Sequence, residues 1–429
     1  MDNNINTSYK KRLIDEKISK YLTIFGGLVI EGPKWCGKTW TALHHAKSVS
    51  YLTDNNVKSL ALSDPKLIFN EERPQLIDEW QLAPCIWDAA RLECDLSGHK
   101  GNFILTGSTT LQKEDEDKVE HSGAGRFCAF KMYPMSLYES GDSTGSVSLK
   151  DLFDNKKILE HVDTLDLKQI AYLVIRGGWP ANIGVSEDLA GVIPKSYIEM
   201  LLTKDIHERK DRRRNSTKMG MLLKSLARNE SSIVSINTII NDISEFQIEN
   251  ERIESRDTVD DYLSALNDLY IINNQPAFSI NYRSSARIGK SVKRHFIDPS
   301  ITCAALSLDV NKLLYDLNTF GLIFESLVYR DLSIYMDYLG GKVYHFRDNV
   351  SGDEVDEIVE LNDGRYGAIE VKLAYNEKSI ADAKKSLLSF KENVEKKPDF
   401  LCIIVGNLGG AYVDKETGIY VVPINALKP

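Results

Sequence analysis

The segment Gly32-Pro33-Lys34-Trp35-Cys36-Gly37-Lys38-Thr39 constrains the fold of this chain more than any other segment. It follows a short apolar run, Leu28-Val29-Ile30, and precedes a stretch of helical character that begins near Lys38. The spacing is that of G-x-x-x-x-G-K-[ST], in which glycines let backbone N–H groups turn toward phosphate oxygens and the helix start adds positive potential. We therefore expect a strand, a phosphate-binding loop and a helix within a parallel sheet. A chance match in a glycine turn is the alternative.

The residues of this loop have separate expected roles. Lys38 can reach the β- and γ-phosphates of a nucleotide, and the Thr39 hydroxyl can bind Mg²⁺. ATP and Mg²⁺ are therefore the expected cofactors. The residues predicted to bind the nucleotide are Gly32, Pro33, Lys34, Trp35, Cys36, Gly37, Lys38 and Thr39.

Polar side chains also follow two other apolar runs. Asp78 and Glu79 end one run, where Asp78 would hold Mg²⁺ through water and Glu79 would polarise the attacking water. Thr106 and Ser108 end another, at a position that senses the γ-phosphate in such folds, although turn chemistry explains them equally well. Arg126 is the candidate for stabilising charge on the phosphates, with an ordinary surface arginine as the alternative.

Length and composition limit the class of protein. A chain of 429 residues implies two to four domains at roughly 100–200 residues per domain. The net charge of −9 argues against a dedicated basic DNA coat. No apolar run approaches the length of about 20 residues that spans a bilayer, and the polar N-terminus does not resemble a secretory signal. Scattered cysteines without a C-x-x-C pair indicate a reduced cytoplasm, so we expect a cytoplasmic protein without a membrane partner.

The centre of the chain is more basic than its flanks. Residues 195–300 contain 17 Lys+Arg against 15 Asp+Glu. The order of helices and a strand after Ser231 suits a winged helix, and basic segments at 209–214 and 283–294 could contact DNA or RNA phosphates. The expected recognition helix, 257–270, is acidic and would be repelled from a major groove. Binding to a nucleic-acid backbone and a structural or protein-contact role both stay open.

The C-terminal part predicts a hairpin that carries charged side chains. Asp356, Glu370 and Lys372 show a D…E-x-K arrangement that resembles the PD-(D/E)XK nuclease core. Glu370 and Lys372 share one face of a strand because they are two residues apart. A three-residue loop at Asn362-Asp363-Gly364, with Gly364 left-handed, would place Asp356 opposite Glu370. We favour this register over that of a two-residue loop, which would mix polar and apolar side chains on both faces.

Two carboxylates that face each other repel unless a cation lies between them. Asp356 and Glu370 are therefore predicted to hold a divalent metal ion, with Glu325 joining from the preceding helix. Lys372 would steer water or stabilise the phosphate at the transition state. A solvated hairpin with an ion pair is the alternative, and many domains with this core keep the fold for binding or scaffolding.

An ordered set of segments extends over about residues 20–375: GPKWCGKT, LIDEWQLAP, NFILTGS, GAGRF, YPMSLYE and GGWPA. This set resembles bacterial and archaeal AAA-type ATP-binding proteins that carry a C-terminal domain of unknown function related to PD-(D/E)XK nucleases. The resemblance implies binding of ATP or GTP with Mg²⁺, and slow hydrolysis used as a switch.

The sequence thus predicts an α/β protein with an AAA-type P-loop NTPase domain, a helical and winged-helix middle, and an α/β nuclease-like C-terminal domain. The expected boundaries are 1–145 for the ATPase domain, 146–228 for a helical lid or connector, 229–304 for the winged helix and 305–429 for the nuclease-like domain.

The leading hypothesis is a slow Mg²⁺-dependent ATPase whose nucleotide state controls a nucleic-acid-directed C-terminal domain. The alternative is an ATP-dependent regulatory or scaffolding switch with an inert nuclease-like fold, whose partners are proteins or further copies of the chain.

Overall fold

The computed structural model describes residues 9–70, 72–109, 123–205, 215–245, 256–279, 292–348 and 352–429. They form two compact units. The first comprises residues up to Pro134 together with Trp179–Ala181 and Leu266–Ile271, and the second comprises the rest. The first of these segments ends at Pro134, and the boundaries expected from the sequence stay predictions.

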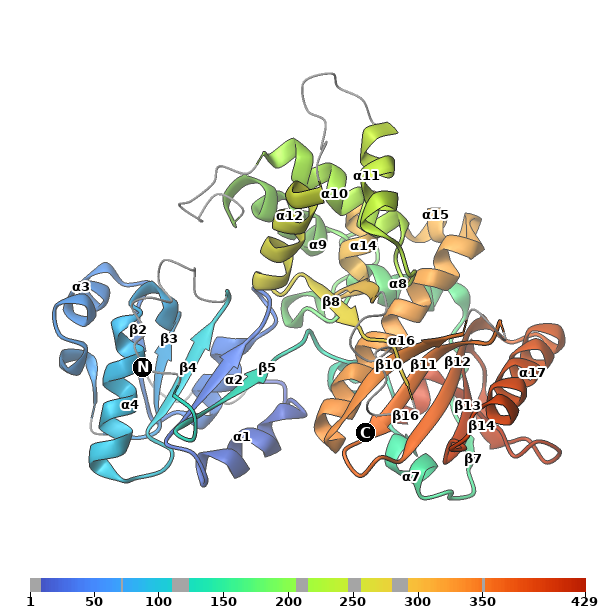
Figure 1. The fold of residues 1–429 in the computed structure, drawn as a ribbon, viewed down its shortest axis with the longest axis horizontal. Helices are drawn as coiled ribbons and strands as arrows, with labels where there is room; N and C mark the ends of the chain where they lie inside the picture. The colour runs from blue at the N-terminus through green and yellow to red at the C-terminus, as the bar shows by residue number, and fades with distance from the viewer. Residues whose placement is uncertain are drawn as a thin grey trace. The chain divides into compact units, whose positions relative to one another are not determined.

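The first unit is built on a five-stranded parallel sheet of order β2-β3-β4-β1-β5, drawn in blue to green in Figure 1. Its elements are α1 (Ile14–Leu22), β1 (Gly27–Glu31), α2 (Lys38–His45), β2 (Ser48–Tyr51), α3 (Asn55–Ser63), β3 (Gln75–Asp78), α4 (Cys85–Ser97), β4 (Phe103–Gly107) and β5 (Phe127–Lys131). The strand expected at 28–30 is confirmed as β1, and the two apolar runs that end at Asp78 and Thr106 form β3 and β4. Because all five strands are parallel, their carboxyl ends lie along one edge of the sheet.

The N-terminal part of the second unit is mainly helical. Its elements are α6 (Leu137–Ser140), β6 (Val147–Ser148), α7 (Leu149–Phe153), β7 (Leu159–His161), α8 (Leu167–Arg176), α9 (Val192–Met200), a π-helical turn at Leu201–Asp205, α10 (Ser216–Arg228), α11 (Ile236–Glu245), α12 (Arg256–Asp268), β8 (Ile272–Gln275), β9 (Lys293–Phe296), α14 (Pro299–Ala305) and α15 (Val310–Tyr315). Strands β8 and β9 pair antiparallel. The succession of α10, α11, α12 and this hairpin has the order expected of a winged helix, whose identity stays a prediction.

The C-terminal part of the second unit contains a mixed seven-stranded sheet of order β10-β11-β12-β13-β15-β14-β7. Its remaining elements are α16 (Leu317–Leu339), β10 (Gly341–Arg347), β11 (Glu354–Leu361), β12 (Tyr366–Ala374), α17 (Glu377–Asn393), β13 (Phe400–Asn407), β14 (Gly410–Val413), β15 (Tyr420–Pro423) and β16 (Leu427–Lys428). Strands β11 and β12 form the hairpin that the sequence predicts around residues 362–364.

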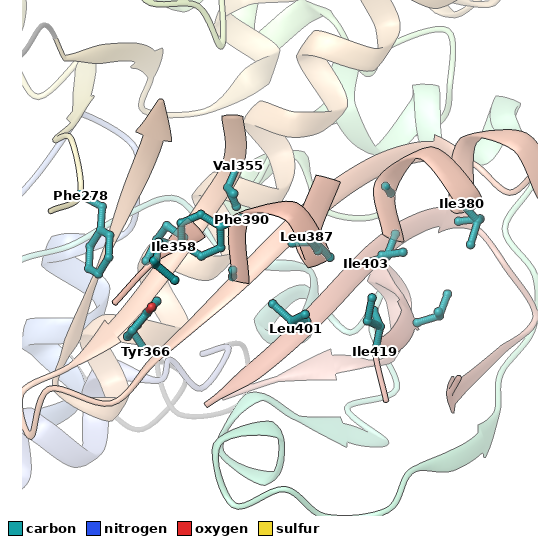
Figure 2. Close-up of a cluster of buried hydrophobic side chains, with 14 of the residues drawn as sticks. Phe278, Val355, Ile358, Tyr366, Ile380, Leu387, Phe390, Leu401, Ile403 and Ile419 are labelled. Atoms are coloured by element: carbon teal, nitrogen blue, oxygen red, sulfur yellow. The ribbon is translucent and has the colours of Figure 1, made fainter. Parts of the chain in front are cut away.

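Helices cover both faces of this sheet. On one face Leu387 and Phe390 of α17 pack on Ile358, Leu401 and other strand residues (Figure 2). On the other face α8 and α16 approach β13 so closely that a Cβ on Gly406 would lie 3.2 Å from Phe324 of α16. Each fully buried Leu or Phe contributes roughly 1.5–3 kcal/mol to folding. Burial on both faces explains why β13 and β15 are almost continuously apolar.

The hairpin of β11 and β12 has the predicted register. Glu357 lies opposite Ile369, and Glu360 lies opposite Tyr366. The paired residues end at Glu357, and the side chain of Asp356 accepts the Val371 N–H at 2.8 Å. Gly364 has φ +84°, as the three-residue loop requires. The pairing of β10 with β11 shifts between Tyr344 and Phe346, which places an irregularity at the Asp356 end of β11.

The Gly- and Ser-rich segment 141–148, which composition suggests as a linker, is instead bound to the C-terminus. Its strand β6 pairs with β16, so that Val147 lies beside Leu427. The Ser143 hydroxyl donates to the Leu427 carbonyl at 2.7 Å, and the Thr144 N–H donates to the Asn425 carbonyl at 2.8 Å. The last residues of the chain therefore complete the second unit.

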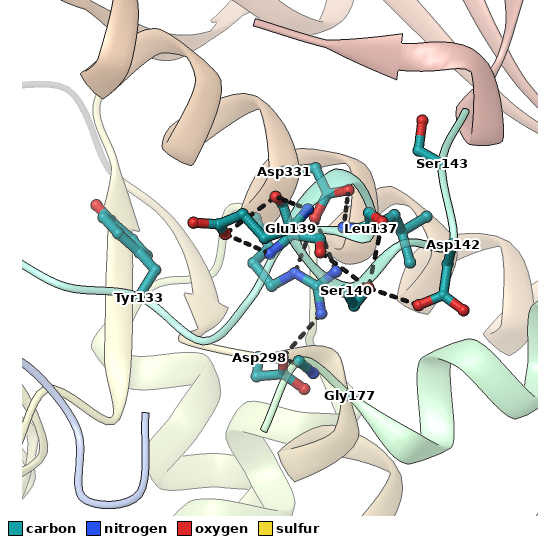
Figure 3. Close-up of polar contacts among 12 residues, drawn as sticks. Tyr133, Leu137, Glu139, Ser140, Asp142, Ser143, Gly177, Asp298 and Asp331 are labelled. Atoms are coloured by element: carbon teal, nitrogen blue, oxygen red, sulfur yellow. Dashed lines mark hydrogen bonds and ion pairs between the residues drawn. The ribbon is translucent and has the colours of Figure 1, made fainter. Parts of the chain in front are cut away.

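A buried arginine joins four segments of the second unit (Figure 3). Arg330 of α16 donates to Asp331 at 2.7 Å and to Asp298 at 2.9 Å, and all three side chains are at most 2% exposed. Asp331 also accepts the N–H of Leu137 at 3.0 Å, and Asp298 accepts the N–H of Gly178 at 2.9 Å. Each charge is thus compensated by direct partners.

Replacement of Arg330 by Met should destabilise the second unit by about 3–5 kcal/mol, because two buried carboxylates would lose their cation. Urea unfolding followed by circular dichroism measures the change. The control is Lys150→Met, which removes an exposed ion pair to Asp154 and should change stability by less than about 1 kcal/mol. Equal unfolding midpoints for the two variants would contradict this account of Arg330.

Candidate functional site

The loop between β1 and α2 has the backbone geometry of a phosphate-binding loop. Gly32 and Gly37 have φ +155° and +103°, and a Cβ on Gly32 would lie 2.3 Å from the Met132 carbonyl oxygen. The ammonium of Lys38 is buried and donates to the carbonyl oxygens of Gly32 at 3.0 Å and Pro33 at 2.8 Å. The loop therefore wraps around the lysine that is predicted to contact the phosphates.

The carboxylate of Asp78 connects the ends of β3 and β4 with the start of α2. Its Oδ1 accepts the Thr39 hydroxyl at 2.8 Å and the Thr106 hydroxyl at 2.6 Å. The structure thus brings together the two residues predicted to hold Mg²⁺. An oxygen donor set of one carboxylate and one hydroxyl fits Mg²⁺, which keeps several waters and takes few protein ligands.

Glu79 and Ser108 also meet at this edge. The Ser108 hydroxyl donates to Glu79 Oε2 at 2.9 Å, and the amide of Gln81 donates to the same oxygen at 2.5 Å. Glu79 has φ +55°, a left-handed conformation that is strained for a residue with a side chain. The backbone turn and two donors therefore fix the direction of this carboxylate. Gln81 was not predicted, since nothing in the sequence distinguishes it from a surface glutamine.

Arg12 is a further residue at the loop that sequence reasoning missed. Its guanidinium donates to the carbonyl oxygens of Cys36 at 2.9 Å and Tyr133 at 2.8 Å. Trp35, in the same loop, is 41% exposed and has φ +66°. Arg12 thus holds the loop through its carbonyl contacts, while the Trp35 side chain is partly exposed to solvent.

Arg126 lies at the opposite edge of the sheet. It precedes β5, whose first residue pairs with Gly27 at the amino end of β1, and it donates to Asp95 at 2.8 Å. The structure does not bring Arg126 to the phosphate loop of its own chain. The cation at the carboxyl end of β5 is Lys131, and burial lowers its pKa to about 8.

A second cluster of charged groups lies in the C-terminal part. Lys372 donates to Glu370 at 2.7 Å and lies 3.8 Å from Asp356. Asp356 accepts the Val371 N–H at 2.8 Å. Glu325 of α16 forms an ion pair with Lys293 of β9. The structure thus brings Asp356, Glu370 and Lys372 together, whereas Glu325 pairs with Lys293 instead.

The hairpin of β8 and β9 adds further residues that were not predicted. Gln275 donates to the buried Glu357 at 2.5 Å, and its own oxygen lies 3.1 Å from Nε2 of His295. Burial raises the pKa of Glu357 well above its ordinary range and lowers the pKa of His295. The sequence singles out Asp356 by its motif, and its neighbour Glu357 has no such signal.

Within the described ranges, no group of three or more His, Cys, Asp or Glu side chains is arranged to hold a metal ion. The metal site of Glu325, Asp356 and Glu370 therefore stays a prediction. Of the basic segments, 209–214 and 283–291 lie outside the described residues. Lys293 is engaged with Glu325, and Arg294 donates to the Val234 carbonyl at 3.0 Å.

No helix in the described parts of the chain combines the length and apolarity needed to cross a membrane.

Three sequence profiles match this chain. A profile described as an AAA domain matches residues 26–141. Two described as domains of unknown function, DUF8612 and DUF4143, match residues 167–312 and 320–427. No curated protein matches the chain significantly.

The solved structures that this chain resembles are only weakly similar to it. A Walker-type ATPase of Pyrococcus abyssi is 13% identical, with a TM-score of 0.40, over 68% of this chain and 94% of that chain. The ORC2 protein of Aeropyrum pernix is 11% identical, with a TM-score of 0.32, over 73% of this chain and 90% of that chain. The profile match is the stronger finding. Residues 26–141 therefore form an AAA domain, which two domains of unknown function follow.

Proposed function

We propose that this chain is a Mg²⁺-dependent nucleoside-triphosphatase whose nucleotide state controls a metal-dependent C-terminal domain directed at nucleic acid. The observation that carries the first part is the contact of Asp78 with both Thr39 and Thr106. It joins the phosphate loop to the ends of two neighbouring strands, where a triphosphate and its metal ion would lie.

Each residue at this edge has a role in the proposed hydrolysis. Backbone N–H groups of the loop and Lys38 hold the β- and γ-phosphates, and Lys38 exchanges its carbonyl partners for phosphate oxygens. Thr39 and Asp78 would hold Mg²⁺, which would neutralise charge on the phosphates. Glu79 orients the attacking water and accepts its proton, while Ser108 keeps the carboxylate of Glu79 in place.

The second part rests on the arrangement of Asp356, Glu370 and Lys372. The hairpin register places both carboxylates beside the ammonium of Lys372. Carboxylate oxygens of this kind suit Mg²⁺ or Mn²⁺, and an adjacent lysine can stabilise a phosphodiester transition state. Asp356 and Glu370 are therefore the proposed ligands of this ion.

Protonation of Glu370 bears on this proposal. Burial raises the pKa of Glu370 to about 7, the charge of Asp356 adds to this effect, and Lys372 and Ser386 oppose it. A protonated carboxyl group is a poor metal ligand. Neutral to alkaline pH is therefore the range in which Glu370 can serve as one.

Replacement of Glu79 by Gln should leave ATP binding intact and lower hydrolysis by about 100-fold or more, because the water loses its base. The Lys38→Ala variant should lose both ATP binding and hydrolysis, because the phosphates no longer have this buried cation as a partner. Fluorescent-nucleotide titration and phosphate release measure the two steps, with the exposed Lys47→Ala as control. Undiminished ATPase activity in Lys38→Ala would refute the proposed nucleotide site.

Replacement of Lys372 by Ala should abolish Mn²⁺-dependent cleavage of DNA or RNA while nucleotide binding survives. The comparison is Lys378→Ala, an exposed lysine of α17 in the same part of the chain. Substrates should include both nucleic acids, with and without ATP. If the wild-type chain cleaves neither under any of these conditions, the inert regulatory or scaffolding switch is the better description.

The stability of the second unit should fall as pH rises from about 4.5 to about 7, the ordinary and folded pKa of Glu370. Folded Glu370 keeps its proton in this range while the unfolded group has lost it, so the folded state binds more protons. Urea midpoints across the range measure the slope. Glu370→Gln should flatten it, and the exposed Glu377→Gln should not. An unchanged slope in Glu370→Gln would show that other groups dominate.

A further inference from the structure

Arg12 contacts the phosphate loop from the segment that precedes the first helix. Its Nη1 donates to the carbonyl oxygen of Cys36 at 2.9 Å, and its Nη2 donates to that of Tyr133 at 2.8 Å. The residue is 4% exposed. A buried guanidinium is unfavourable unless its N–H groups find acceptors. Both terminal nitrogens of this side chain are therefore committed to backbone carbonyls at the loop.

The Cys36 carbonyl belongs to the peptide unit that supplies the N–H of Gly37. This peptide bond is trans, and in a planar trans peptide the C=O and the N–H point in opposite directions. Gly37 is the second glycine of the loop, and backbone N–H groups of such loops surround phosphate oxygens. Because Arg12 holds the carbonyl on one side of the peptide, the Gly37 N–H points to the side away from Arg12.

The second carbonyl that Arg12 contacts belongs to the segment after β5, against which the loop packs. A Cβ on Gly32 would lie 2.3 Å from the Met132 carbonyl oxygen, and the thiol of Cys36 lies 3.8 Å from the same oxygen. The guanidinium is planar and keeps its N–H donors in a fixed geometry. The contact of Arg12 with Tyr133 therefore fixes the direction of the Cys36 carbonyl relative to β5.

The backbone of Arg12 is attached to α2, the helix that follows the loop. Its N–H donates to Asp15 Oδ2 at 2.7 Å, and Asp15 Oδ1 lies 3.1 Å from Nε2 of His45. The hydroxyl of Tyr9 donates to Asp15 Oδ1 at 2.7 Å, and its ring stacks on His44 with 4.4 Å between the centroids. Both histidines belong to α2. The guanidinium is therefore held from α2 as well as from β5.

We propose that Arg12 is a positioning residue that turns the Gly37 N–H toward the phosphates of the nucleotide before the nucleotide binds. This role rests on the proposed nucleotide site, and Arg12 itself does not touch the reacting atoms. A donor that is oriented in advance loses less freedom on binding, so the affinity is higher. The charge of the guanidinium also polarises the peptide, which makes its N–H a better donor.

The expected effect is on binding rather than on the chemical step. The loop N–H groups contact the α- and β-phosphates, which ATP and ADP share. A contact that is equally strong before and during hydrolysis changes KM and leaves kcat unaltered. Loss of Arg12 should therefore weaken ATP and ADP by the same factor and change kcat by less than about twofold.

The test is calorimetric titration of the full chain with ATP and with ADP in the presence of Mg²⁺, together with phosphate release at saturating ATP. We expect Arg12→Met to bind each nucleotide at least about tenfold more weakly. The control is Lys11→Met in the same segment. Lys11 is 76% exposed and lies 3.8 Å from Glu16, so its loss removes a neighbouring charge but no loop contact. This control should behave as the wild type.

Arg12→Lys keeps the charge but not the planar fork that contacts both carbonyls, so its ATP affinity should lie between those of the wild type and Arg12→Met. It carries the test if circular dichroism shows that Arg12→Met does not fold. Wild-type affinity in Arg12→Met or in Arg12→Lys, or a fall in kcat with unchanged affinity, would overturn the role of Arg12 and leave the nucleotide site standing.

Two further outcomes separate this role from the proposed function. A wild-type chain that binds neither ATP nor ADP would refute the nucleotide site and the role of Arg12 together. Nucleotide binding that Arg12→Met weakens, without hydrolysis by the wild type, would support the role of Arg12 and refute the proposed triphosphatase activity.

Discussion

The second unit depends on the compensation of one buried charge, the guanidinium of Arg330. Asp298 and Asp331 neutralise it, and each of these carboxylates accepts a backbone N–H from a segment far away in the chain, at Gly178 and Leu137. A buried ion that loses one partner is strongly unfavourable. These contacts therefore hold α16 against the backbone segments at Leu137 and Gly178.

The same fixation extends to β9. Asp298 follows β9 closely, so the segment from Lys293 to Asp298 forms two ion pairs with α16. In one pair the segment supplies the cation, Lys293, to Glu325. In the other it supplies the anion, Asp298, to Arg330. Between them Glu230 accepts the N–H of Phe296 and the hydroxyl of Ser326. The segment that carries the partner of Glu325 thus also carries the partner of Arg330.

Local patterns predicted most of what is local in the structure. The phosphate loop, the strands β1, β3 and β4, and the register of β11 with β12 follow from glycine positions and short apolar runs. Segment 141–148 was wrongly interpreted as a linker because Gly and Ser favour exposed loops, whereas its hydrogen bonds go to the C-terminus. Strands such as β14 and β15 were missed because only pairing with distant neighbours defines them.

Charge pairing between distant segments explains why the prediction for the basic segment 283–294 differs from the contacts that Lys293 and Arg294 make in the structure. Lysine is rarely buried unless it is paired, so a basic stretch such as 283–294 is naturally assigned to a surface that meets phosphates. Lys293 is engaged with Glu325 from α16, and Arg294 is engaged with a backbone carbonyl. Counting cations along the chain therefore overstates the charge that this segment can offer to a nucleic acid. The same pairing shows that Lys293 is engaged inside the second unit rather than with an external polyanion.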